Sequence, residues 1–192
     1  MLLTYDDLFA HTQVNELLYA QDDGQVVPIN EALINASSID ITLGENIFVE
    51  AYDNNVDQQI IDLSEGKFMD MDKISIKNSP YLLEPGDFIL AESEQYFNLP
   101  NSIAGLYVLK STLARNGLNH LNAGWCDPGF HDSKLTLELQ NVTKYHTWRL
   151  RCGMKIGQIF FLKGKLVPQD KSYAKKGQYN KLDSVAQGKQ LR

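Results

Sequence analysis

Cysteine is nearly absent from this chain: Cys126 and Cys152 are the only two among 192 residues. Two cysteines cannot form a disulfide framework or a cysteine-rich zinc site, so a reducing cytosol is the expected compartment. Uninterrupted apolar runs are short as well, and none approaches the roughly 18 residues that a membrane span needs. The start of the chain becomes acidic at Asp6 and Asp7, which no secretory signal does. We therefore expect a cytoplasmic protein with no membrane partner.

Several familiar catalytic motifs are missing too. The sequence has no Walker-A loop, no G-x-G-x-x-G and no G-x-S-x-G. Its histidines form no H-x-E or H-E-x-x-H pair, and the two cysteines stand 26 positions apart rather than in C-x-x-C. Zinc deaminases need such elements. The sequence therefore predicts no metal ligands and no zinc, and only His120, which stands between two unusual loops, is set apart from the other histidines.

The composition is that of an ordinary folded domain with an uneven charge. Apolar residues make up 43% of the chain, enough for a real core, and the formal net charge is −6. Residues 163–192 carry eight Lys or Arg and two Asp, so this tail has a charge of +6 and residues 1–162 carry −12. The negative overall charge argues against nucleic-acid binding. The tail is either a solvated end or a mobile segment that closes over an anionic ligand.

Short segments that alternate between apolar and polar residues dominate the middle of the sequence. Before them, apolar residues recur at helical spacing, so residues 1–20 are predicted to be helical, with Thr4 and Asp7 as a capping box. The later strand-like segments are separated by turn residues, and the first of them is expected to stop at a turn over residues 44–46. We expect one all-β domain spanning residues 1–192, a sandwich or barrel with short helices.

The segment that follows one of the apolar runs combines two cations and two hydroxyls, namely Lys110, Ser111, Thr112 and Arg115. Ser111 is a favourable N-cap and Gly117 a favourable stop for one short helical turn. Such a turn would put Ser111 and Arg115 on one face, where they could hold a phosphate. The alternative is a capped connector whose cations point into solvent.

Two further segments could supply a carboxylate. Asp127 precedes the rigid Pro128-Gly129 turn, where it could orient water or a sugar hydroxyl, or merely satisfy its own loop. In residues 134–141, the period of two places three leucines on one face and Thr136 and Glu138 on the other. That second face is either solvated or the wall of a pocket in which Glu138 could transfer protons.

Together these segments resemble the dCTP deaminase branch of the dUTPase-like family. The resemblance covers most of residues 30–165, and the order and approximate spacing of the motifs are intact. It is carried by residues 37–44 (SSIDITLG), 110–118 (KSTLARNGL), 123–130 (AGWCDPGF), 135–141 (LTLELQN) and 153–159 (GMKIGQI). Several linked motifs in register are more specific than any one of them.

The resemblance implies a dUTPase-like distorted β-barrel or β-clip, assembled as a homotrimer or hexamer with shared active sites. It also implies hydrolytic deamination of dCTP to dUTP and ammonia, which supplies thymidylate synthesis in a microbial cell or in virus-infected host cytoplasm. Mg²⁺ would be bound through the triphosphate. By position in the motifs, Glu138 would be the catalytic proton shuttle. The substrate would be bound by Lys110, Ser111, Thr112, Arg115, Ala123, Asp127, Thr136, Tyr173 and Tyr179.

The sequence departs from the family pattern at several positions. Lys110 and Thr112 stand where the family usually has Arg and Ser, and residues 131–133 are one residue longer than usual. The basic segment 163–192 is expected to be a mobile C-terminal lid. Within it, Gln178 and Leu182 stand where Lys and Gln are expected.

Two other functions stay open. The segment 123–127 also resembles the water-binding loop of dUTPases, so the chain could be a dUTP diphosphatase or a bifunctional enzyme that converts dCTP to dUMP. The third interpretation is a catalytically silent nucleotide-binding member of the fold. A silent protein, however, has little physical need for Glu138 opposite a phosphate cradle that contains Ser111 and Arg115.

Overall fold

Strands make up most of the regular structure, as the alternating patterns predicted. The computed structural model describes residues 1–51, 60–65 and 68–189. Its strands are β1 (Leu17–Asp22), β2 (Gln25–Val27), β3 (Ile39–Glu50), β4 (Met71–Ser75), β5 (Tyr81–Leu83), β6 (Phe88–Asn98), β7 (Ile103–Leu109), β8 (Leu118–His120), β9 (Trp125–Cys126), β10 (His131–Asn141), β11 (Trp148–Leu150) and β12 (Lys155–Lys163). Its helices are α1 (Tyr5–Gln13), α2 (Ser111–Arg115) and α3 (Tyr173–Lys176), and two 3-10 turns cover Glu31–Leu33 and Leu63–Glu65. Among these helices none has the length and apolar character to cross a membrane.

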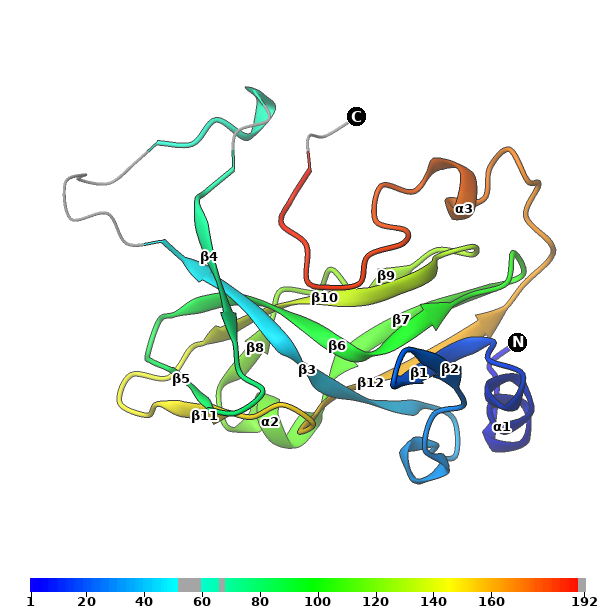
Figure 1. Cartoon of the computed structure of the whole chain (residues 1–192), viewed down its shortest axis with the longest axis horizontal. Coiled ribbons are helices and arrows are strands. Elements are labelled where there is room, and N and C mark those ends of the chain that lie inside the picture. The colour runs from blue at the N-terminus through cyan, green and yellow to red at the C-terminus, as the bar shows by residue number, and fades with distance from the viewer. Residues whose placement is uncertain (52–59, 66–67, 190–192) are drawn as a thin grey trace.

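The described strands form one large curled sheet and one small sheet (Figure 1). In the large sheet the strand order is β2-β1-β6-β3-β12-β7-β9, and β10 pairs with both β6 and β8. β4 extends β3, and β5 pairs with β11 in the small sheet. Since β10 has a partner on both sides, its two faces are held in a defined orientation. The predicted all-β class with short helices is confirmed.

The core side of β10 is made of leucines. Leu135, Leu137 and Leu139 are all buried, so the predicted alternation is confirmed. Full burial of one leucine stabilises a fold by roughly 1.5–3 kcal/mol relative to exposure. The opposite face is not simply solvated, because the side chain of Glu138 is only 23% exposed. This face is therefore partly covered by other parts of the chain.

The helical prediction for residues 1–20 is wrong beyond Gln13. The capping box does form, and the Asp7 carboxylate accepts a hydrogen bond of 3.3 Å from the Thr4 N–H. The chain then reverses through Asn15, whose φ is +58°, and continues as β1, which is paired with β6. Leu18 is fully buried in this strand. The spacing of the apolar residues in this segment suits a helix or a strand equally. The pairing with β6, which is distant in the sequence, decides for the strand.

The turn expected at residues 44–46 is also wrong, because β3 runs without a break from residue 39 to residue 50. Gly44 has another purpose there. A Cβ added to Gly44 would lie 2.4 Å from the Cγ atom of Glu92, so only glycine leaves room for that side chain. The register between β3 and β6 shifts between Leu43 and Ile47, as in a β-bulge. Gly44 therefore marks a close approach rather than a turn.

The start of β10 is irregular at residues 131–133, the segment expected to be one residue longer than usual. Asp132 has φ +49°, and the register between β10 and β6 shifts between His131 and Ser133 and again between Lys134 and Thr136. Such shifts are typical of β-bulges. From Thr136 to Gln140 the pairing with β6 is regular, and Glu138 lies opposite Leu90.

The C-terminal segment returns from β12 and packs over β10. Figure 1 shows α3 and the red end of the chain above β10 and β9. The Lys134 N–H donates to the carbonyl oxygen of Leu182 over 2.9 Å, and the Leu182 N–H donates to Oγ of Ser133 over 3.1 Å. Val185 is buried. The described part of the C-terminal segment thus covers the face of β10 that carries Glu138.

Candidate active site

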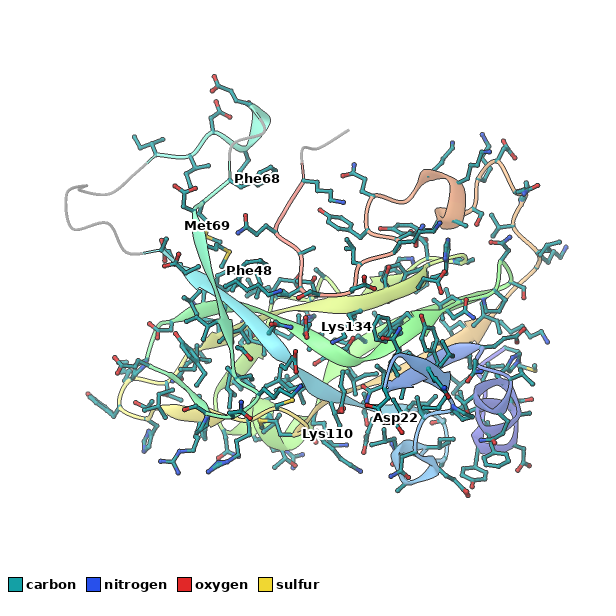
Figure 2. The ribbon with its side chains drawn as sticks, viewed as in Figure 1. Asp22, Phe48, Phe68, Met69, Lys110 and Lys134 are labelled. Carbon is teal, nitrogen blue, oxygen red and sulfur yellow. The ribbon has the colours of Figure 1, made fainter. Side chains whose placement is uncertain are left out.

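A cavity of about 690 Å³ lies between β10 and the C-terminal segment. Small-molecule sites commonly measure roughly 300–1,000 Å³, so this space suits a nucleotide. Six of the ten residues predicted for the site line it: Ala123, Asp127, Thr136, Glu138, Tyr173 and Tyr179. The described cavity walls also contain apolar side chains that include Phe68 and Met69, which Figure 2 labels beside β4.

Glu138 lines this cavity, and the buried His120 lies behind it. The Oε2 atom of Glu138 lies 3.2 Å from Nε2 of His120, although the two are not aligned as a hydrogen bond. Within the described residues, neither atom has a hydrogen-bond partner. The Nδ1 atom of His120 accepts a hydrogen bond of 3.2 Å from the Asn122 N–H, which assigns the proton of a neutral ring to Nε2. A carboxylate oxygen and a ring nitrogen therefore lie close together, buried behind the cavity wall that Glu138 forms.

Tyr107 lies beside His120 and Glu138. The sequence analysis did not predict it as a site residue. Its ring packs edge-on against His120, with centroids 4.8 Å apart, and its hydroxyl is buried without a partner among the described residues. Burial raises the pKa of Tyr107, and the nearby Glu138 carboxylate raises it further. A Cβ on Gly157 would lie 2.3 Å from the Tyr107 hydroxyl, so that glycine makes room for the ring. No local pattern marks Tyr107, because its neighbours come from β8, β10 and β12.

The loop around Asp127 has a defined shape. The indole Nε1 of Trp125 donates to Oδ1 of Asp127 over 3.0 Å, and the Phe130 N–H donates to the Asp127 carbonyl oxygen over 3.1 Å. The Tyr173 N–H donates to the Pro128 carbonyl oxygen over 3.0 Å, which ties the tail to the loop. Asp127 remains exposed at the cavity rather than buried in its own turn. Its carboxylate is therefore available to a ligand.

The predicted phosphate cradle lies elsewhere in the chain. Lys110, Ser111, Thr112 and Arg115 are absent from the described walls of the cavity, and the last three are exposed. Figure 2 shows Lys110 beside α2, below the strand face that carries Lys134. Lys110 rather than Ser111 is the N-cap of α2, so that detail of the prediction is wrong, while Gly117 follows the helix with φ +87° as expected. One chain does not bring the cradle to Glu138.

Asp40 forms an ion pair with Lys110, the N-cap residue of α2. Its Oδ1 lies 2.5 Å from Nζ of Lys110 and its Oδ2 lies 2.8 Å from Nζ of Lys155. Burial alone would raise the pKa of Asp40, but the hydrogen bonds from Lys110, Lys155 and Asn35 outweigh burial and hold the pKa below its usual value. The ion pair fixes the position of Lys110, and with two lysines on one carboxylate the cluster keeps a net positive charge.

The tail supplies the remaining predicted residues. Tyr173 packs edge-on against Phe130, with centroids 5.6 Å apart. Tyr179 lies under the ammonium group of Lys189, which is 4.9 Å from the ring centroid. Leu182 lines the main cavity, and Gln178 lines a smaller neighbouring one that also includes Asp127. The tail therefore forms one side of the cavity, as expected of a segment that covers a ligand.

Comparison with known proteins identifies relatives of this chain. A family model described as dCTP deaminase-like matches residues 9–164. The chain is 38% identical over 136 residues to "dCTP deaminase, dUMP-forming" of Methanospirillum hungatei, covering 70% of each chain. It is 34% identical over 164 residues to the protein of the same name from Mycobacterium ulcerans, covering 85% of this chain and 80% of the relative.

A solved structure shows the same fold. The crystal structure of 2'-deoxycytidine 5'-triphosphate deaminase from Agrobacterium tumefaciens matches with a TM-score of 0.63 and 18% sequence identity. The match covers 85% of this chain but 48% of the other, so the chain spans about half the length of that protein. The predicted dUTPase-like β fold is confirmed by this likeness.

Proposed function

The chain belongs to the dCTP deaminase-like family, and from this premise we propose that it converts dCTP to dUMP by deamination followed by hydrolysis of the triphosphate. The sequence favoured deamination that stops at dUTP, with dUMP formation as the alternative. The names of the relatives support the alternative better. The overall reaction consumes two water molecules and releases ammonia and pyrophosphate.

The position of Glu138 at the cavity wall, with the buried His120 behind it, carries the proposal for the first step. Glu138 takes a proton from a water molecule, and the resulting hydroxide attacks C4 of cytosine. Glu138 passes this proton to N3, then takes the proton of the new C4 hydroxyl and gives it to the amino group. The tetrahedral intermediate collapses as the C4–N bond breaks, which leaves the uracil carbonyl and ammonia. The ring of His120, whose Nε2 lies 3.2 Å from Oε2 of Glu138, packs behind the carboxylate and limits where it can move. Exclusion of bulk water by the tail strengthens these interactions.

Asp127 supports the second step and the binding of the sugar. It is a second carboxylate at the same cavity, on the loop that resembles the water-binding loop of dUTPases. We infer that Asp127 orients the deoxyribose and that the loop 123–127 places a water for attack on the α-phosphorus. Attack there breaks the bond to the bridging oxygen and releases pyrophosphate, leaving dUMP.

The phosphates require a second copy of the chain. Because Ser111, Thr112 and Arg115 are exposed and lie outside the cavity, we propose that α2 of a neighbouring subunit in a homotrimer supplies them, with Lys110 held by Asp40. The triphosphate enters as its Mg²⁺ complex. Among the described residues no three acidic, His or Cys side chains cluster closely enough to bind the ion, so the ion is assigned to the phosphates as part of the substrate.

The test is a product analysis with dCTP and Mg²⁺, in which ammonia, dUTP, dUMP and pyrophosphate are measured together. We expect ammonia, dUMP and pyrophosphate from the unmodified protein and no ammonia from Glu138→Gln. A second incubation with dUTP should give dUMP with both proteins if Glu138 serves only the deamination. Accumulation of dUTP without pyrophosphate would show that the protein only deaminates dCTP. Tight binding of dCTP without any product would show that it is the catalytically silent nucleotide-binding protein.

A further inference from the structure

Glu92 is a buried carboxylate in the middle of β6 that no motif singled out. It is 0% exposed, and a buried charge costs several kcal/mol unless it is paired and hydrogen-bonded. Its Oε1 atom accepts from Nζ of Lys134 over 2.9 Å and from Nδ2 of Asn46 over 3.0 Å. Lys134 comes from β10 and Asn46 from β3, so this oxygen is bound by the body of the sheet.

The second oxygen of Glu92 is bound by the tail. Oε2 accepts from Oγ of Ser184 over 2.9 Å and from the Val185 N–H over 2.8 Å. The next residue, Ala186, donates its N–H to Oγ1 of Thr136 over 3.1 Å. Glu92 therefore joins β3, β6 and β10 through one oxygen and the C-terminal segment through the other.

The surroundings of Glu92 are built for a charged group. Gly44 leaves the space that its side chain occupies, since a Cβ there would lie 2.4 Å from Cγ of Glu92. Lys134 is 12% exposed, and its ammonium group also lies 5.5 Å from the ring centroid of Tyr96. Burial alone would raise the pKa of Glu92, but the contacts with Lys134, Val185 and Asn46 hold it below its usual value. The carboxylate is thus ionised at neutral pH.

The tail residues next to this contact close the cavity. Leu182, Ala186, Gln187 and Gly188 line the same space as Glu138 and Thr136. Figure 2 shows Lys134 beside the lowest part of the red C-terminal segment. The hydrogen bonds from Leu182 and Ala186 to β10 hold the two ends of this stretch, and the two hydrogen bonds to Glu92 hold its middle. The position of the middle of this cavity wall therefore depends on Glu92.

We propose that Glu92 is a positioning residue for the reaction, which anchors the tail at Ser184 and Val185 and so holds the cavity closed over the nucleotide. Lys134 keeps the anchor ionised and aligned. The identity of the nucleotide rests on the proposed function, whereas the anchoring of the tail does not. A purely structural ion pair inside the sheet would stabilise the protein without any specific effect on the tail or on substrate binding.

The first experiment follows amide hydrogen exchange in peptides that cover residues 182–188, without a ligand. In Glu92→Gln, one oxygen is replaced by an NH₂ group that cannot accept from the tail or from Lys134, and we expect exchange at 182–188 to accelerate about ten-fold or more. Exchange in β6 and β10 should stay unchanged. Glu94→Gln is the matched control, because Glu94 is exposed on the same strand and contacts Thr42 instead. Unchanged exchange at 182–188 in Glu92→Gln would overturn the proposal.

The second experiment uses variants of the tail, which leave the buried pair of Glu92 and Lys134 in place should Glu92→Gln fold poorly. Ser184→Ala with Val185→Pro removes both donors to Oε2, and we expect a KM for dCTP raised about ten-fold with a smaller change in kcat. Adding Glu92→Gln to these changes should raise KM no further, because all three act through one contact. Additive effects on KM would overturn the proposal.

The two experiments separate this proposal from the proposed function. If the tail is released in Glu92→Gln but no variant or parent turns over dCTP, the anchor stands and the proposed function fails. If dCTP is converted normally while exchange in the tail does not respond to Glu92, the proposed function stands and the anchor fails.

Discussion

The Nε2 atom of His120 lies 3.2 Å from the Oε2 atom of Glu138, and neither atom has a hydrogen-bond partner among the described residues. His120 is on β8 and Glu138 on β10, and these strands pair antiparallel. The Asn122 N–H donates to the other ring nitrogen of His120, which fixes the ring beside the carboxylate. The ring therefore packs behind Glu138 on the side away from the cavity.

Replacement of His120 should impair deamination more than binding. In His120→Gln, Glu138 loses the ring that packs behind its carboxylate, and we expect kcat for ammonia release to fall by about ten- to hundred-fold with little change in KM. The measurement is the steady-state rate of ammonia release. His146→Gln is the control, because His146 is exposed, whereas His120 is buried beside Glu138. An unchanged kcat in His120→Gln would remove His120 from the mechanism.

The hydroxyl of Tyr107 should be dispensable for folding. It is buried without a partner in the described part of the chain, so Tyr107→Phe removes an uncompensated polar group. We expect the free energy of unfolding to stay the same or to rise by up to about 1 kcal/mol. Tyr19→Phe is the matched control and should lose stability, because that buried hydroxyl donates to Asp132 over 3.3 Å. Denaturant unfolding of both variants makes the comparison, and a clear loss in Tyr107→Phe would point to a water bound at the hydroxyl.

Glu92 should make the stability of the protein depend on pH in the acid range. Burial opposes ionisation, but Lys134 and the other hydrogen-bond donors lower the pKa of Glu92 below its ordinary value of 4.5. A carboxyl group whose pKa is lower in the folded than in the unfolded state stabilises the folded protein at pH values above its unfolded-state pKa. This contribution is lost as the pH falls through the folded-state pKa. We expect the free energy of unfolding to decrease below about pH 4.5 less steeply in Glu92→Gln than in the parent.

The same pH series has an internal control. Asp40 also has a lowered pKa and remains in both proteins, so the difference between the two curves reports Glu92 alone. Parallel curves between pH 3 and pH 6 would mean that Glu92 has the same pKa in the folded and unfolded chains.

Two inactive variants should restore activity when they share a trimer. Glu138→Gln retains the phosphate cradle on α2, and Arg115→Ala retains the carboxylate. If a site takes Glu138 from one subunit and Arg115 from its neighbour, random mixing leaves about a quarter of the sites intact. The check is ammonia release from co-expressed chains that carry different purification tags, compared with each variant alone. No recovery from verified mixed oligomers would place both residues in the site of one chain.

The sequence alone was sufficient for the class of fold, the leucine face of β10 and six of the ten predicted residues that line the cavity. The leucine face depends on a local property, the period of two along residues 134–141. The tail tyrosines were predicted from the resemblance that the order of the motifs carries.

Only the tertiary structure decided how distant segments meet. The apolar spacing at Leu17 and Leu18 fits a helix or a strand, and pairing with β6 made it a strand. A glycine such as Gly44 is typical of a turn. Here the strand needs a glycine because the side chain of Glu92, from another strand, occupies the space beside it. Tyr107 and Glu92 carry no local signal, since their partners come from other strands and from the tail. The sequence set His120 apart by its place between two loops, but only the fold shows that it lies beside Glu138. Periodicity reports which face of a segment is buried, whereas contacts between segments arise only when the whole sheet has formed.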